Sequence, residues 1–279
     1  MSEGMDFAQR IAEDKAIRSH MDKIGRKILI MSGKGGVGKT TMTVNLANAL
    51  VDMGRRVGIL DVDLHGPNVA KMLGCEDGIL TTEGEGENFF PVEARPGLKV
   101  MSLAFAIREK DSPIVWRGPM KTAAIRQFLA QAQWGELDYL LIDSPPGTGD
   151  EQLTICQTIK ELTGTIIVTT PQEVAILDAR RSVSFSRSMG VAILGIVENM
   201  SGLFCPHCNT EIPVFGIGGG ERRRSWPRWF SRRPGRRPPR IISRLRVRTK
   251  NVVAEPRRSI ARSHVCPTQA FHKSSQCRS

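Results

Sequence analysis

The chain has 279 residues, a length that suits one large α/β domain or two small ones with a sizeable core. Its formal net charge of +12 is unevenly spread: residues 221–279 carry 18 basic residues against two acids, whereas residues 1–220 carry 22 against 26. No stretch approaches the ~18 apolar residues of a membrane span, and the acidic start at 1–6 lacks the apolar segment of a secretory signal. Six cysteines in a chain of this length do not suggest a disulfide scaffold, so we expect a reduced, cytoplasmic protein.

The order of helical and strand-like segments predicts the fold class. Residues 6–27 are charged and rich in helix formers, which predicts one amphipathic leader helix. After it, helical patterns alternate with apolar runs that predict strands at 28–31, 57–60, 98–102, 139–142, 165–169 and 193–198. This alternation indicates an α/β fold with a mostly parallel sheet covered by helices on both faces. Ligands bind such sheets at the carboxyl ends of the strands, where the polar motifs of this chain lie.

The first predicted strand leads into a glycine-rich loop that opens a helical segment. The loop reads Gly33, Lys34, Gly35, Gly36, Val37, Gly38, Lys39, Thr40 and Thr41, which fits the pattern G-x-x-x-x-G-K-[ST]. Backbone N–H groups and the helix N-terminus bind nucleotide phosphates in this context. Lys39 is expected at the β- and γ-phosphates and the Thr40 hydroxyl at Mg²⁺. A glycine-rich turn between buried elements is the alternative, and it gives Lys39 no role.

Carboxylates follow two later strands. Asp61 and Asp63 come after the strand at 57–60, and Asp143 comes at the tip of the strand at 139–142. A carboxylate in the position of Asp143 suits a Walker B residue that holds Mg²⁺ through water. The Pro-Pro-Gly-Thr-Gly run at 145–149 predicts a switch loop that moves when the γ-phosphate leaves. Solvated acids in a strand-end turn are the alternative for Asp61 and Asp63.

A pair of cysteines near the end of the patterned region is a candidate metal site. Cys205 and Cys208 have the Cys-x-x-Cys spacing that zinc and iron–sulfur sites share. The pair supplies two of the usual four ligands, and Cys75 and Cys156 are isolated in the sequence. The missing ligands must come from His207, from other cysteines or from a second subunit related by a twofold axis. A zinc site across a dimer and a thioredoxin-like redox pair are the competing interpretations.

Several motifs together resemble a known family. KGGVGKTT, DVDLHGPN, VWRGPM, DSPPGTGD, VTTPQ and ENMSGLFCPHC resemble the Mrp/NBP35 (ApbC) iron–sulfur cluster carrier ATPases, from about residue 26 to 221. The P-loop, with its second lysine, also resembles the deviant Walker A group of MinD and ParA. The resemblance implies a SIMIBI-type P-loop NTPase that hydrolyses ATP with Mg²⁺. It further implies a homodimer in which a [4Fe–4S] cluster bridges the two subunits. The protein would pass this cluster to apo iron–sulfur proteins. The N-terminal four-cysteine motif of eukaryotic NBP35-type members is absent.

The same resemblance implies roles for single residues. Lys34 is expected to reach the nucleotide of the partner subunit, although a plain surface charge is the alternative. Asp63 is expected to orient the attacking water, so that the implied catalytic residues are Lys34, Lys39 and Asp63. The implied Mg²⁺ residues are Thr40, Asp61 and Asp143. Asn199 is expected to contact adenine, with a turn cap as the alternative, and Cys205 and Cys208 are the implied cluster ligands.

The end of the chain departs from this pattern. We expect a helical leader at 1–26, an ATPase domain with the cysteine pair at 27–221 and an arginine-rich tail at 222–279. Because acids almost vanish and the hydrophobic periodicity is lost in the tail, a translated wrong reading frame is the favoured explanation. A basic tail that binds nucleic acid or anionic lipid, and a partner-binding segment, are the alternatives. A basic tail would suit a ParA/MinD-like switch on DNA or membrane, and a zinc-stabilised scaffold is a further reading of the whole chain.

Overall fold

The computed structural model describes residues 7–63, 66–76, 78, 81–83, 88–102, 105, 118–201, 203–204, 208 and 211–212. The predicted tail at 222–279 lies outside these residues. The main sheet is built from strands β1 Ile24–Met31, β2 Val57–Asp61, β5 Val92–Arg95, β6 Leu98–Ser102, β7 Leu137–Asp143, β8 Gly164–Thr169 and β9 Ile193–Glu198. Two small antiparallel pairs are formed by β3 Thr81–Glu83 with β4 Asn88–Phe90 and by β10 Leu203–Phe204 with β11 Glu211–Ile212.

The seven strands are ordered β5-β6-β2-β7-β1-β8-β9 in the described part of the chain, and all neighbours are parallel except β5 and β6. All six predicted strands are present, so the predicted mostly parallel α/β fold is confirmed. The antiparallel edge strand β5 was not predicted. Strands β1 and β2 both pair in parallel with β7, so the carboxyl ends of all three strands lie together at one edge of the sheet.

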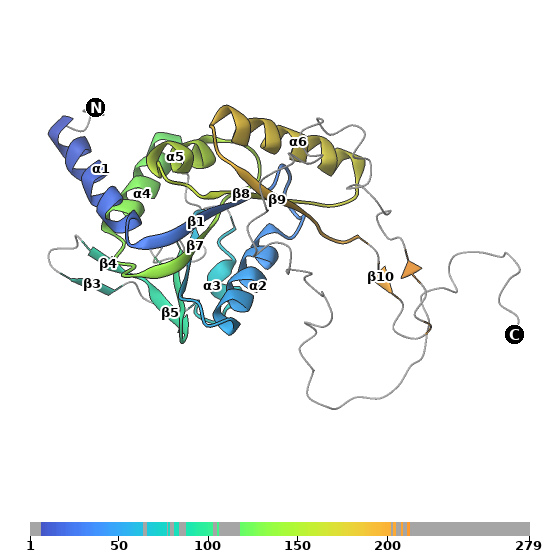
Figure 1. The fold of residues 1–279 in the computed structure, drawn as a ribbon, viewed down its shortest axis with the longest axis horizontal. Coiled ribbons are helices and arrows are strands. Elements are labelled where there is room, and N and C mark those ends of the chain that lie inside the picture. Colours follow the sequence, from blue (N-terminus) through green and yellow to red (C-terminus); the bar gives the residue numbers. More distant parts are fainter. Residues whose placement is uncertain are drawn as a thin grey trace, which may run out of the picture. The chain divides into compact units, whose positions relative to one another are not determined.

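Helices cover both faces of the sheet. They are α1 Phe7–Met21, α2 Lys39–Asp52, α3 Val69–Met72, α4 Gly118–Gln131, α5 Asp150–Thr158 and α6 Glu173–Ser188. Figure 1 shows α2 and α3 on one side of the sheet and α4, α5 and α6 on the other. Strand β1 has fully buried side chains on both faces of the sheet. Leu29 and Met31 join the core with α1, α4 and α5, whereas Ile30, also fully buried, lies on the opposite face because side chains alternate along a strand. No helix of the described residues is long and apolar enough to span a membrane.

The N-terminal helix is shorter than predicted. Helix α1 ends at Met21 and β1 begins at Ile24, inside the segment 6–27 that was expected to be helical. Pairing overrides helical propensity there, because Ile24 lies opposite Leu137 of β7. Lys27 was expected to lie within this helix. Instead it is 4% exposed in β1, and its Nζ donates to the carbonyl of Met21, the last residue of α1, so that it caps the helix.

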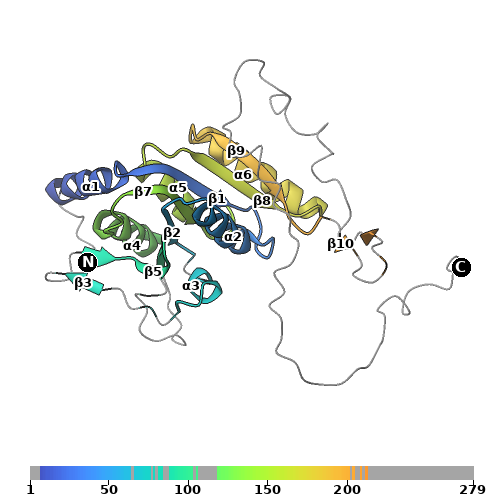
Figure 2. The ribbon, with the colours of Figure 1, turned by 60° about the horizontal axis from the view of Figure 1, so that its bottom comes forward.

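Helix α1 packs on the domain. Both ribbon views place it beside α4 (Figures 1 and 2). Ile17 is 2% exposed and contributes to the main core. The Arg126 guanidinium of α4 contacts Glu13 and Asp14 at 2.7 Å each. Burial and an ion-pair cluster therefore join the predicted leader to the sheet-covering layer.

Candidate functional site

The glycine-rich loop lies where β1 ends and α2 begins. Gly38, directly before α2, has φ +85°, a left-handed conformation that favours glycine. A Cβ at Gly33 would lie 2.2 Å from the Asp178 carbonyl carbon of α6, so only glycine permits this close approach. The loop thus has the strand–loop–helix geometry that the sequence predicted, with the N-terminus of α2 at the carboxyl edge of the sheet.

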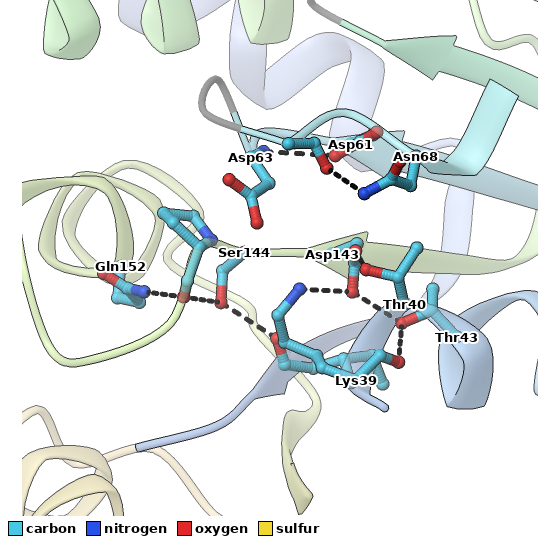
Figure 3. Close-up of polar contacts among 12 residues, drawn as sticks. Lys39, Thr40, Thr43, Asp61, Asp63, Asn68, Asp143, Ser144 and Gln152 are labelled. Atoms are coloured by element: carbon cyan, nitrogen blue, oxygen red, sulfur yellow. Dashed lines mark hydrogen bonds and ion pairs between the residues drawn. The ribbon is translucent and has the colours of Figure 1, made fainter. Parts of the chain in front are cut away.

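Asp143 is the polar centre of this edge. It is fully buried at the end of β7, and three side chains of α2 converge on it (Figure 3). Lys39 Nζ lies 2.9 Å from Oδ1, Thr43 Oγ1 donates to Oδ1 at 2.7 Å, and Thr40 Oγ1 donates to Oδ2 at 2.7 Å. The predicted P-loop and Walker B residues are therefore in direct contact although about 100 residues separate them. Thr43 was not predicted; its signal was a polar residue one turn after Lys39 on the buried face of α2.

Asp61 lies beside Asp143, because the two residues are paired in the register of β2 and β7. It accepts hydrogen bonds from Ser102 Oγ at 3.2 Å and from the Asp63 backbone N–H at 3.1 Å. Burial, and then the nearby Asp143 carboxylate, raise the pKa of Asp61 to about 7. When both carboxylates are ionised, two negative charges face one ammonium, that of Lys39. Together with the Thr40 hydroxyl, these oxygens form the kind of donor set that suits Mg²⁺.

A cleft of about 270 Å³ opens beside these residues. It is lined by the loop residues 34–41 together with Ser32, Asp63, Gly66, Asn68 and Pro146. The buried Lys39 ammonium has its ion pair with Asp143 but no hydrogen bond within the described residues, and the buried Ser32 hydroxyl likewise has none there. Buried donors without partners are costly unless a ligand satisfies them. The cleft therefore fits a group rich in acceptor oxygens, as a polyphosphate is.

The remaining predicted site residues are distributed around the cleft. Lys34 is exposed on the loop and lines the cleft, as does Asp63. Asn199 directly follows β9, and its amide donates to the Val37 carbonyl at 3.0 Å, so it contacts the loop itself. Its predicted contact with adenine stays a prediction. Cys205 lies outside the described residues, whereas Cys208 is exposed between β10 and β11.

The predicted switch loop joins Asp143 to α5. Ser144, directly before the loop, donates its hydroxyl to the Ile30 carbonyl at 2.9 Å. The Gly147 N–H donates to the Ser32 carbonyl at 2.7 Å, directly before the glycine-rich loop. Gln152 of α5 contacts both ends of the loop 145–149, and it was not predicted from the sequence. Its only sequence signal was a glutamine at the third position of a helix.

Comparison with known proteins places this site in a family. The model of the ParA family described as NUBPL iron-transfer P-loop NTPase matches residues 23–226. This chain belongs to that family. The match covers the glycine-rich loop, the three strand-end carboxylates and both cysteines of the Cys-x-x-Cys pair. The family that the sequence motifs resembled is thereby confirmed.

This iron-transfer P-loop NTPase is also similar to individual proteins and to a solved structure. The iron-sulfur cluster carrier protein of Methanocaldococcus jannaschii is 53% identical over 210 residues, which are 75% of this chain and 72% of that protein. The cytosolic Fe-S cluster assembly factor Nubp2 homolog of Drosophila sechellia is 48% identical over 202 residues, covering 72% and 78%. Among solved structures, a nucleotide-binding protein from Archaeoglobus fulgidus in complex with ADP matches with a TM-score of 0.65 at 41% identity, covering 76% and 82%.

Proposed function

We propose that this chain is an ATP-hydrolysing carrier that binds a [4Fe–4S] cluster as its cargo and transfers it to apo iron–sulfur proteins in the cytoplasm. The observation that carries the nucleotide half is the convergence of Lys39, Thr40 and Thr43 on the buried Asp143. The cargo half is supported by the iron-transfer family and by relatives named as cluster carriers. Cys205 and Cys208 are the proposed cluster ligands.

The geometry suggests how the chain handles ATP. The N–H groups of the loop and the Lys39 ammonium would neutralise phosphate charge, which is most of what phosphoryl transfer asks of a protein. Thr40, Asp61 and Asp143 would hold Mg²⁺, which supplies further charge neutralisation when bound. Asp63, at the rim of the cleft, would orient the attacking water. These roles need only the side chains that the fold already gathers at the carboxyl edge of β1, β2 and β7.

The fold also supports a path from nucleotide to cargo. Asn199 donates to the Val37 carbonyl of the glycine-rich loop, and it stands six residues before Cys205 in the sequence. If nucleotide binding changes the conformation of the glycine-rich loop, Asn199 would therefore transmit the movement to the start of the segment that carries the two cysteines. With two proposed cluster cysteines per chain, Cys205 and Cys208, a four-thiolate cluster would be completed by a second copy, which is the proposed homodimer.

Anaerobic reconstitution with iron and sulfide tests the cargo proposal. The wild-type chain should bind about four iron and four sulfide ions per two subunits and sediment as a dimer. The pair Cys205→Ser and Cys208→Ser should lose the iron, whereas the control pair Cys75→Ser and Cys156→Ser should keep it. Cluster retained by the first pair would refute the cysteine assignment. Zinc in place of iron after anaerobic purification would favour the zinc-stabilised scaffold.

The role proposed for Lys34 has its own test. If Lys34 acts on the nucleotide of a partner subunit, Lys34→Ala should lower the ATP hydrolysis rate at least tenfold and leave ATP binding within about twofold. Lys23→Ala, an exposed lysine in the turn after α1, is the matched control. Hydrolysis by Lys34→Ala at the wild-type rate would show that Lys34 is a surface charge.

A further inference from the structure

One buried amide spans the proposed switch loop. Gln152 is the third residue of α5, and its side chain is completely buried. Its Oε1 accepts from the Gly149 N–H at 2.9 Å, and its Nε2 donates to the Pro145 carbonyl. Pro145 is the first residue of the loop and Gly149 is its last. A single side chain therefore ties the two ends of the loop together.

The opposite side of this loop faces the nucleotide cleft. The Gly147 N–H donates to the Ser32 carbonyl at 2.7 Å, next to the glycine-rich loop. Pro146 lines the cleft itself. The loop is thus held between two contacts: one backbone hydrogen bond toward the cleft and the Gln152 amide toward α5. Its position relative to the cleft depends on both.

Gln152 acts from a rigid support. The neighbouring Glu151 of α5 pairs with Lys121 of α4 at 3.0 Å, and the two side chains are 10% and 15% exposed. This pair fixes the first turn of α5 against α4. A change at the cleft is therefore expected to move the loop past Gln152 and not to move Gln152 itself.

Helix capping alone does not account for both contacts. A side chain at the third helical position that accepts from the N–H before the helix is half of a capping box, and Glu serves there as well as Gln. Only an amide can also donate to the Pro145 carbonyl. The donor half of Gln152 thus has no capping role and is directed at the loop.

We propose that Gln152 is a positioning residue that holds the loop 145–149 against the nucleotide cleft for ATP hydrolysis. The inference rests on the proposed ATPase function. It assigns the effect to the donor atom Nε2, because that atom fixes the end of the loop that follows Asp143. Loss of this donor should free the loop without removing any group that contacts the phosphates.

Gln152→Glu isolates the donor, since the carboxylate keeps the acceptor for the Gly149 N–H and cannot donate when ionised. We expect kcat for ATP hydrolysis to fall at least tenfold, KM for ATP to stay within twofold, and hydrogen exchange at the Gly147 amide to rise at least tenfold. Gln152→Met, similar in length and uncharged, should give the same pattern if the buried carboxylate prevents folding. Gln133→Glu is the control: Gln133 is half-buried and donates to Asn88, and it precedes β7 at the end opposite Asp143.

The outcomes separate this inference from the proposed function. Wild-type kcat in folded Gln152→Glu or Gln152→Met, with unchanged exchange at Gly147, would overturn it. A fall in kcat with no change in Gly147 exchange would also overturn it, because the loop would then not be what Gln152 holds. If the wild-type chain hydrolyses no ATP, the ATPase proposal fails, and the exchange at Gly147 alone decides whether Gln152 holds the loop.

Discussion

Asp61 and Asp143 occupy paired positions at the carboxyl ends of the neighbouring strands β2 and β7, and both carboxyl groups are buried. One ammonium, that of Lys39, faces this pair. Like charges held this close disfavour double ionisation, which adds to burial in raising the pKa of Asp61 to about 7 from its ordinary 3.8. Bound Mg²⁺ would offset the repulsion between the two carboxylates when both are ionised.

The raised pKa predicts how stability depends on pH without Mg²⁺ and nucleotide. Between pH 3.8 and about 7 the folded state binds a proton at Asp61 that the unfolded state has lost. The free energy of unfolding should therefore be highest below this window and fall as pH rises through it. Asp61→Asn should flatten this part of the profile, as measured by urea unfolding in chelator. Asp22→Asn, exposed after α1, should keep the wild-type slope; equal slopes in all three proteins would contradict the prediction.

The second prediction concerns Asp143 itself. Asp143→Asn keeps the volume but removes the charge that faces Lys39, and it disturbs the hydrogen bonds from Thr40 and Thr43. We expect ATP hydrolysis to fall by roughly 100-fold, since charge stabilisation dominates this chemistry. Steady-state hydrolysis at saturating ATP measures it. Asp138→Asn, at the other end of β7, should hydrolyse ATP at the wild-type rate, and comparable rates for the two variants would exclude the proposed role.

The third prediction tests whether α1 is part of the domain. Ile17 of α1 is 2% exposed in the main core, whereas Ile11 of the same helix is 53% exposed. Ile17→Ala should lower the free energy of unfolding by about 2–5 kcal/mol through lost burial and a cavity. Ile11→Ala should change it by less than about 0.5 kcal/mol. Equal, small effects in denaturant unfolding would mean that the helix is a separable leader.

The sequence was sufficient for the elements whose apolar pattern is continuous. The fully buried strands around 28–31 and 139–142 could be predicted because both faces of each strand are covered, which leaves no alternation to misread. The end of α1 could not. Its helix-forming residues continue past Met21, and only the pairing of Ile24 with Leu137 on a distant strand decides for β-structure.

The site divides in the same way. Lys39, Thr40 and Asp143 were predictable because a motif fixes their spacing from a strand or a helix end, and the structure places them in contact. Ser102 and Gln152 could not be predicted, because their roles depend on neighbours in space. Ser102 contacts Asp61 on the adjacent strand, and Gln152 contacts the loop that precedes its own helix. The Mg²⁺, adenine and cluster roles stay predictions.

The last prediction concerns Gly38, where the backbone conformation favours glycine and an added Cβ would meet the Asn199 side chain. Its φ is +85°, and a Cβ there would lie 2.3 Å from Asn199 Nδ2, which donates to the Val37 carbonyl. Gly38→Ala should therefore displace Asn199, distort the loop and weaken ATP binding at least tenfold by calorimetry. Gly54→Ala is a matched control: its φ is +76°, so the substitution carries a similar backbone cost of about 1–2 kcal/mol, but no atom lies within 4 Å. Adding Asn199→Ala should raise the free energy of unfolding of Gly38→Ala, because it removes the side chain that the new Cβ meets. The same addition should change the free energy of unfolding of Gly54→Ala by less. Equal ATP affinities for the two glycine variants would show that the contact between Gly38 and Asn199 has no part in forming the site.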